Sequence, residues 1–136
     1  MRSFLSFTFG EKSFTESDYT KHLFSAVYSI ANLEPTIFVG RGAHLILPRD
    51  RVLAIRVICS DKFRVERLAK MLNEKEEQVE KKLGDIDREQ DDFFKRVYGL
   101  KNASPYEFDM VVNCDYIKES AWAAEIVALA FKEKYS

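Results

Sequence analysis

Apolar residues recur at helical spacing in the segment that follows Thr15. Thr15 and Asp18 stand three residues apart before this stripe, as in a capping box, in which each side chain bonds the other residue's backbone. Pro35 closes the segment. The pattern therefore predicts one amphipathic helix, with a stripe made of Tyr19, Leu23, Ala26, Val27 and Ile30.

Three short apolar runs predict strands of a parallel sheet. They are Thr36–Val39, Val52–Ile58 and Met110–Cys114. Their continuous apolar and β-branched character is typical of strands that are buried on both faces. Because helical segments separate the runs, the sequence predicts an α/β fold, a three-layer parallel sheet with flanking helices.

Helix signals fill the segments between these runs. Residues 43–47 predict one helical turn, and Ser60 is a candidate N-cap for a helix over Asp61–Leu72. We expect a second helix from Asn73 to Leu83, a bend at Gly84 and a further helix that stops at Gly99. The last helix is expected to turn inward the side chains of Trp122, Ile126, Leu129 and Ala130.

The length of the chain fits one domain, and its charge balance means that any site for an anion must be a local cluster of basic residues. The chain has 136 residues, and 21 basic against 22 acidic residues leave a formal charge of -1. That balance argues against nucleic acid and anionic membrane as partners. No apolar run approaches the roughly 20 residues that span a bilayer. Cys59 and Cys114 each end an apolar run, so we expect small buried side chains in a reducing, cytoplasmic compartment rather than metal ligands.

Candidate chemistry begins where the first predicted strand ends, at Gly40, Arg41 and Gly42. Ligands of open α/β sheets bind beyond the carboxyl ends of the strands. Flanking glycines let the backbone approach a ligand, and the planar guanidinium of Arg41 suits phosphate. The alternative is a tight turn with a solvent-facing arginine.

A second charged cluster lies at Arg88, Asp92, Lys95 and Arg96, which share one side of a helix. They could close on a chain of phosphates. Alternatively, they form ordinary ion pairs four residues apart, namely Arg88–Asp92, Asp91–Lys95 and Asp92–Arg96. Arg64 and Arg67, after the second predicted strand, either guide phosphate or keep their helix soluble.

In this order, the motifs resemble the cytidylate kinase-like family, a branch of the nucleoside monophosphate kinases. The resemblance rests on Val39–Ala43, Arg64–Arg67, Asp87–Arg96 and Tyr106–Asn113. It implies a P-loop kinase-like fold that passes a phosphoryl group from ATP, assisted by Mg2+, to a nucleoside monophosphate such as CMP. It also implies a single domain over residues 1–136, with a helical lid at about residues 74–99.

The resemblance implies roles for individual residues. Arg41, flanked by Gly40 and Gly42 and assisted by Arg96, would bind the acceptor phosphate. Arg88, Asp92 and Lys95 would act in the lid, where charges neutralise the transferred group, because phosphoryl transfer depends mostly on positioning and electrostatics. Arg64 and Arg67 would contact the phosphates of the cofactor, and no residue is assigned to a metal.

Three departures from the family pattern shape these expectations. The segment G-x-x-x-x-G-K-[ST] is absent, and Gly10–Ser13 matches only its end. Gly42 stands where cytidylate kinases place an aspartate, and Lys95 replaces an arginine. Without the P-loop strand, the predicted sheet would have an empty central slot. A missing N-terminal segment, a strand from a partner such as a second copy, or Leu5, Phe7 and Phe9 of this chain could fill it.

The sequence leaves three functions open. The first is a phosphotransferase that supplies the acceptor and lid portions of a nucleoside monophosphate kinase. The second is a non-catalytic module or regulatory subunit that binds nucleotide or phosphate without ATP chemistry. The third is a remnant with neither function. Coding DNA that continues in frame upstream of Met1 into a strand and a glycine-rich loop would favour the first function, and a stop codon there would favour the second. The third function predicts no binding of nucleotides.

Overall fold

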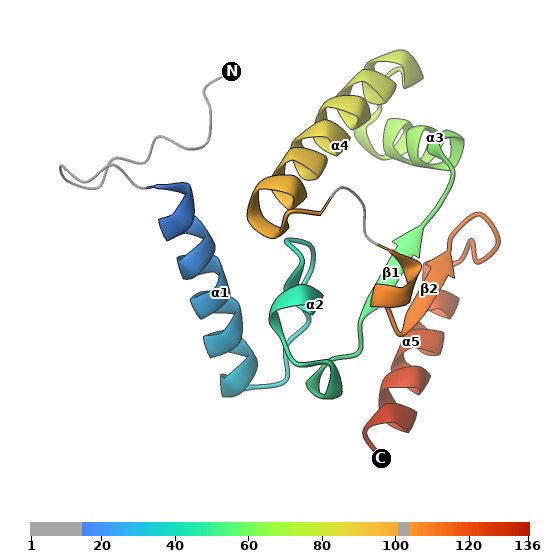
Figure 1. The fold of residues 1–136 in the computed structure, drawn as a ribbon. Helices are drawn as coiled ribbons and strands as arrows, with labels where there is room; N and C mark the ends of the chain where they lie inside the picture. The colour runs from blue at the N-terminus through green and yellow to red at the C-terminus, as the bar shows by residue number, and fades with distance from the viewer. Residues whose placement is uncertain (1–14, 101–103) are drawn as a thin grey trace. The chain divides into compact units, whose positions relative to one another are not determined.

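The computed structural model describes residues 15–100 and 104–136, which belong to two units (Figure 1). The first unit ends at Leu47 and contains α1 (Glu16–Leu33) and α2 (Ala43–Ile46). The second unit, Pro48–Ser136, contains all the remaining elements: η1 (Arg49–Arg51), β1 (Ile55–Ile58), α3 (Asp61–Leu72), α4 (Glu76–Tyr98), η2 (Pro105–Glu107), β2 (Met110–Asn113) and α5 (Ser120–Lys134).

Helix α1 begins with the capping box that the sequence predicts. The Thr15 hydroxyl accepts from the Asp18 amide at 3.2 Å, and the Asp18 carboxylate accepts from the Thr15 amide at 3.1 Å. The Thr15 hydroxyl also donates to the Asp18 carboxylate at 2.6 Å, and this bond, followed by the bond from the Thr15 amide, lowers the pKa of Asp18. Within the predicted stripe, Val27 is buried, whereas Ile30 is 43% exposed. The start of the helix is confirmed, but its stripe is only partly covered.

The strand predicted over Thr36–Val39 is wrong. These residues form no regular element, and Ile37 and Val39 are each 92% exposed. An extended run becomes a strand only when a neighbouring strand satisfies its backbone groups, and isolated pairs are already marginal in water. Within the described residues, no strand pairs with this run. Apolar composition alone therefore did not determine its structure.

The described sheet consists of β1 and β2, which pair in parallel with Ile55 opposite Met110 and Ile58 opposite Asn113. The strands predicted over Val52–Ile58 and Met110–Cys114 are thus confirmed over shorter lengths. Two parallel strands joined through helices are compatible with the α/β class. The three-layer sheet stays a prediction, and Leu5, Phe7 and Phe9 lie outside the described residues.

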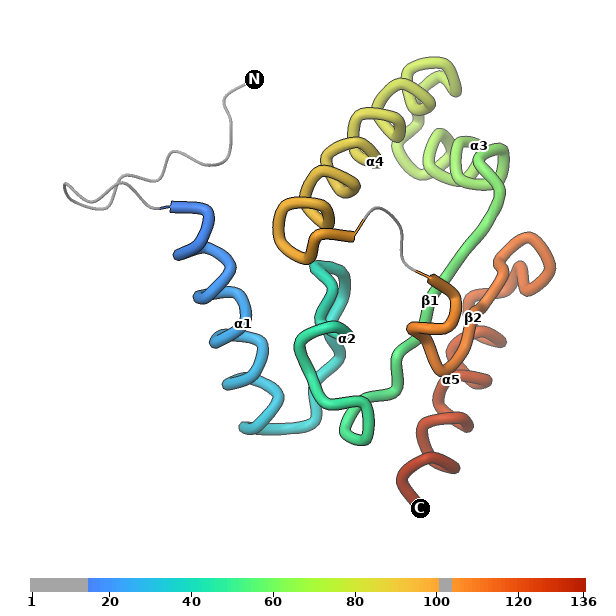
Figure 2. The backbone as a smooth tube through the Cα atoms, in the orientation of Figure 1, coloured from blue at the N-terminus to red at the C-terminus, as the bar shows by residue number. Residues whose placement is uncertain are grey.

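Helices α3 and α4 pack against each other and are joined by a short turn (Figure 2). Ser60 caps α3 as predicted, because its hydroxyl accepts from the Phe63 amide at 3.3 Å. Asn73 does not open the next helix. Its left-handed backbone, with φ of 54°, ends α3, and the Glu74 amide donates to the Ala69 carbonyl at 3.1 Å.

Helix α4 is continuous through Gly84, so the prediction of two separate helices on either side of this residue is wrong. A glycine inside a helix costs only about 1 kcal/mol, which packing of the flanking turns can offset. Val79 and Phe93, on either side of it, are 0% and 6% exposed. The stop at Gly99 is confirmed, because its left-handed backbone lets its amide donate to the Lys95 carbonyl at 3.0 Å.

Helix α5 turns inward only one of the four residues that were predicted there. Trp122 and Leu129 are each 61% exposed, and Ile126 is 43% exposed. Ala130 is half-buried as predicted, and it shares the half-buried side with Ala123 and Val127. Both faces are apolar, so periodicity could not select between them.

The contacts of Lys134 fix which side of α5 faces the rest of the second unit. Lys134 lies on the same side of the helix as the half-buried alanines. Its Nζ donates to the Val52 carbonyl at 2.7 Å and to the Asp109 carboxylate at 3.1 Å. Asp109 also accepts from the Ala54 amide at 2.7 Å and from Arg49 at 3.1 Å. Burial alone would raise the pKa of Asp109, but these hydrogen bonds and charges lower it. Asp109 thus joins the start of β2 to the segment before β1 and to α5.

Candidate functional site

The turn Gly40–Arg41–Gly42, called the Arg41 turn below, places three successive residues in the left-handed region. Their φ angles are 79°, 55° and 68°. A non-glycine residue in this region costs roughly 1–2 kcal/mol, so Arg41 is held in an unfavourable backbone conformation. Gly42 precedes α2, and its carbonyl accepts from the Leu45 amide at 2.8 Å. The turn leaves Arg41 exposed while Gly42 and Ala43 are buried.

Arg64 is engaged by a carboxylate of the neighbouring helix. Its two terminal nitrogens donate to the two oxygens of Asp87 at 2.8 and 2.6 Å, which is a bidentate pair. A weaker contact of 3.5 Å reaches Asp61. The hydrogen bonding between Arg64 and Asp87 raises the pKa of Arg64 and lowers the pKa of Asp87. Sequence reasoning missed Asp87, because nothing in the spacing of the two residues indicates that α4 folds back on α3.

The predicted lid residues share the face of α4 that lies opposite its buried residues. Arg88, Asp92, Lys95 and Arg96 are all exposed, whereas Val79 and Phe93 lie on the other side of the helix. The common face follows from the unbroken helix. The structure therefore brings these four residues together along one helix, as the spacing predicts.

Two contacts of the α4 arginines differ in kind from the predicted ion pairs. Arg88 pairs with Asp85, and the Arg96 Nε donates to the backbone carbonyl of Asp92 at 3.2 Å. Among the described residues, Lys95 and Asp91 form no ion pair with each other. An exposed ion pair contributes only about 0–1 kcal/mol to the stability of the fold. The side chains on this face of α4 can therefore leave these partners for others at little cost in free energy.

Arg67 is exposed on α3, one turn after Arg64. The structure places Arg64 and Arg67 on the same helix but gives them different surroundings, since only Arg64 faces Asp87.

The carboxyl ends of β1 and β2 are held together by Asp115, whose partner Ser60 was not predicted from the sequence. Its carboxylate accepts from both the amide and the hydroxyl of Ser60 at 2.8 Å each. The Asn113 side chain accepts in turn from the Asp115 amide at 3.0 Å. Cys59 and Cys114 lie at this edge and are half-buried rather than fully buried, which corrects the expectation of core positions. Burial, with smaller contributions from Cys114 and Asp115, raises the pKa of Cys59.

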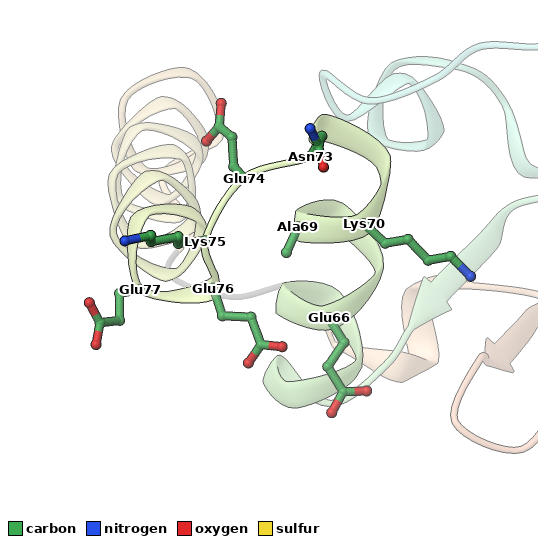
Figure 3. A pocket seen from close by; sticks show the side chains of 8 residues that line it. All are labelled: Glu66, Ala69, Lys70, Asn73, Glu74, Lys75, Glu76 and Glu77. Carbon is green, nitrogen blue, oxygen red and sulfur yellow. The ribbon is translucent and has the colours of Figure 1, made fainter.

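An open depression lies at the turn between α3 and α4 (Figure 3). Its rim carries four glutamates and two lysines, and none of the predicted site residues lines it. This excess of negative charge disfavours phosphate. Across residues 15–100 and 104–136, no group of three or more histidine, cysteine or acidic side chains is placed to hold a metal ion. The lining residues are Glu66, Ala69, Lys70, Asn73, Glu74, Lys75, Glu76 and Glu77.

No described helix is both long enough and apolar enough to cross a bilayer. In comparison with protein families, the chain matches a family described as the cytidylate kinase-like family over residues 1–116. No curated protein matches the chain. The matched range includes the Arg41 turn, α3, α4 and both strands.

Proposed function

Because the chain belongs to the cytidylate kinase-like family, we propose that it is a kinase-like phosphotransferase that supplies the acceptor and lid parts of phosphoryl transfer to a nucleoside monophosphate. Family membership already suggests a kinase-like function. The proposal adds CMP or a related monophosphate as the acceptor, and a single domain over residues 1–136 with its lid at about residues 74–99.

The observation that carries the proposal is the Arg41 turn within the matched family range. A left-handed arginine between two left-handed glycines is costly, and such strain persists where the surrounding structure requires it. Strained residues cluster at ligand sites. We assign Arg41 the acceptor phosphate, because its guanidinium offers two parallel N–H donors to two phosphate oxygens. Gly40 and Gly42 would let the phosphate approach the backbone.

The exposed face of α4 suits the lid role. Arg88 and Lys95 would neutralise charge on the transferred phosphoryl group, and Asp92 would orient them or a ribose hydroxyl. Arg96 would assist at the acceptor phosphate. Because the contacts of Arg88 are exposed and local, a phosphate could replace them without unfolding the helix.

Arg64 fits the proposed cofactor role less well than Arg67. Its bidentate pair with Asp87 already occupies both terminal nitrogens, so a phosphate would have to share or displace that carboxylate. Arg67 is exposed on the same helix. ATP and Mg2+ are implied by the family, but the chain has no G-x-x-x-x-G-K-[ST] segment, and the described residues hold no cluster of metal ligands. We therefore derive no step through ATP or Mg2+.

A second candidate is a nucleotide-binding module without phosphotransfer, and the missing P-loop segment favours it. Calorimetric titration of the chain with CMP, other monophosphates and ATP with Mg2+ tests both. We expect a monophosphate to bind more tightly than ATP, because the acceptor residues are present and the P-loop is not. Transfer of labelled γ-phosphate to the bound monophosphate would favour the enzyme, and binding without transfer would favour the module. No binding of any nucleotide would reject both.

A further inference from the structure

The two cysteines of the chain lie next to each other at the carboxyl ends of β1 and β2. The strands pair with Ile58 opposite Asn113. The Cys114 amide donates to the Ile58 carbonyl at 2.8 Å, and this hydrogen bond belongs to that last pair of the ladder. Cys59 and Cys114 directly follow the paired residues Ile58 and Asn113, so they occupy the next equivalent positions of the two segments.

This register is compatible with a disulfide. Adjacent strands lie about 4.7–4.9 Å apart, and the Cα atoms of disulfide-bonded cysteines are usually about 4.4–6.8 Å apart. Side chains of registered residues in a parallel pair point to the same face of the sheet. Both thiols are free and half-buried. Burial raises the pKa of Cys59 and Cys114 adds to that rise, as expected for two thiols within electrostatic reach of each other.

We propose that Cys59 and Cys114 form a reversible intramolecular disulfide when the chain meets a small-molecule disulfide. One cysteine thiolate attacks the small disulfide, releases one small thiol and leaves a mixed disulfide. The other cysteine then attacks the protein sulfur and releases the second small thiol. The two cysteines together lose two electrons and two protons, and the two released thiols gain them. The inference does not depend on the proposed function.

The position of this bridge gives it a structural effect. Ser60 and Asp115 directly follow the two cysteines, and their hydrogen bonds fix the start of α3. A bridge between Cys59 and Cys114 would also close a loop that contains both α3 and α4. Cross-linking a long loop restricts the unfolded chain, so the oxidised form should unfold at a higher temperature than the reduced form.

Mass spectrometry of the whole chain in a series of oxidised and reduced glutathione buffers tests the proposal. We expect monomeric chain to lose the mass of two hydrogen atoms, both thiols to disappear together, and reducing agent to restore them. The thiolate is the nucleophile, so the reaction should also speed up with rising pH. Accumulation of glutathione adducts on both cysteines, or oxidation only into dimers linked between chains, would overturn the proposal.

Cysteine variants test whether the disulfide forms because Cys59 and Cys114 occupy equivalent positions on the two strands, or only because two thiols are near each other. Cys59→Ser and Cys114→Ser should each leave a stable glutathione adduct on the remaining cysteine. Asn113→Cys in the Cys114→Ser background keeps two thiols but moves one to the opposite face of the strand, so it should close far more slowly than the wild type. Equal closure would overturn the role of register. If circular dichroism shows that this variant does not fold, the wild-type masses alone decide the question.

Discussion

The Arg41 turn and the α3–α4 pair both carry arginines that the sequence marked for phosphate, yet they hold them by different means. In the turn, the backbone fixes the arginine, through three successive positive φ angles. In the helix pair, side chains fix it, through a bidentate contact from Arg64 to Asp87. To bind phosphate, Arg64 would have to share or displace the Asp87 carboxylate. The comparison therefore ranks Arg64 low as a ligand residue, whereas Arg41 is distinguished by its backbone conformation.

The largest expected effect concerns the α3–α4 pair. Val79 is fully buried, so Val79→Asp would place an uncompensated charge where the helices pack. We expect a loss of roughly 3–5 kcal/mol in the free energy of unfolding of the second unit. Denaturant unfolding followed by circular dichroism measures it.

The matched control for that prediction is Gln78→Asp, one residue earlier on the exposed side of α4. It introduces the same carboxylate in the first turn of the helix, where negative charge is tolerated or favourable. Its effect should stay within about 0.5 kcal/mol. Equal destabilisation by both variants would mean that α4 is not held by its buried side.

The second effect concerns binding at the Arg41 turn. Arg41→Ala should weaken binding of the monophosphate by about 1.5–3 kcal/mol, which is roughly tenfold to 150-fold, because one charge-assisted contact is lost. Arg41→Lys keeps the charge but loses the planar fork, so it should fall between the wild type and Arg41→Ala. Calorimetric titration with CMP measures both variants.

Stability provides the control for the Arg41 variants. Arg41→Gly should also lose the phosphate contact. It stabilises the folded state by about 1 kcal/mol, because the left-handed strain is removed, and it stabilises the unfolded state by a similar amount, because glycine makes the unfolded chain more flexible. Its free energy of unfolding should therefore stay near the wild-type value. Unchanged affinity in all three variants would contradict the acceptor role of Arg41.

The same contrast explains what the sequence could and could not predict. Local signals were sufficient where the neighbours along the chain decide the structure, as at the Thr15 cap, the Ser60 cap and the Gly99 stop. They failed where distant partners decide it. Thr36–Val39 has strand composition but no neighbouring strand within the described residues, and α5 has two apolar faces between which Lys134 selects.

The candidate site follows the same division. The common face of Arg88, Asp92, Lys95 and Arg96 follows from helical periodicity and was predictable. The partners Asp87 and Asp115 were not, because each meets a residue far away in the sequence, Arg64 and Ser60 respectively. The glycines of the Arg41 turn signalled a special backbone, but nothing in the sequence indicated that Arg41 itself adopts a left-handed conformation.

A third, smaller effect is the change in stability when alanine replaces a glycine, which should have opposite signs in the Arg41 turn and in α4. Gly40 has a φ of 79°, so Gly40→Ala should destabilise the first unit by about 1 kcal/mol, although no atom lies within 4 Å of the added methyl group. Gly84 lies in a regular helix with equal space, so Gly84→Ala should stabilise the second unit by about 0.5–1 kcal/mol. Thermal unfolding measures both signs. Destabilisation by Gly84→Ala would show that α4 does need a bend there.

The smallest effect is the pH dependence of the contact between Arg64 and Asp87. The pKa of Asp87 is lowered in the folded chain, so the pair stabilises above the unfolded pKa, about 4, and loses its effect as the pH falls through the lower folded pKa. Because the Asp87 side chain is 50% exposed, Asp87→Asn should cost at most about 1 kcal/mol at pH 7. That difference from the wild type should shrink towards zero at low pH. Asp91→Asn, an exposed change on the same helix, should instead show little difference at either pH, in denaturant unfolding at pH 7 and pH 3. A constant Asp87→Asn difference across this range would mean that shape rather than charge holds Arg64 in place, and Arg64 would then be freer to bind phosphate than the comparison implies.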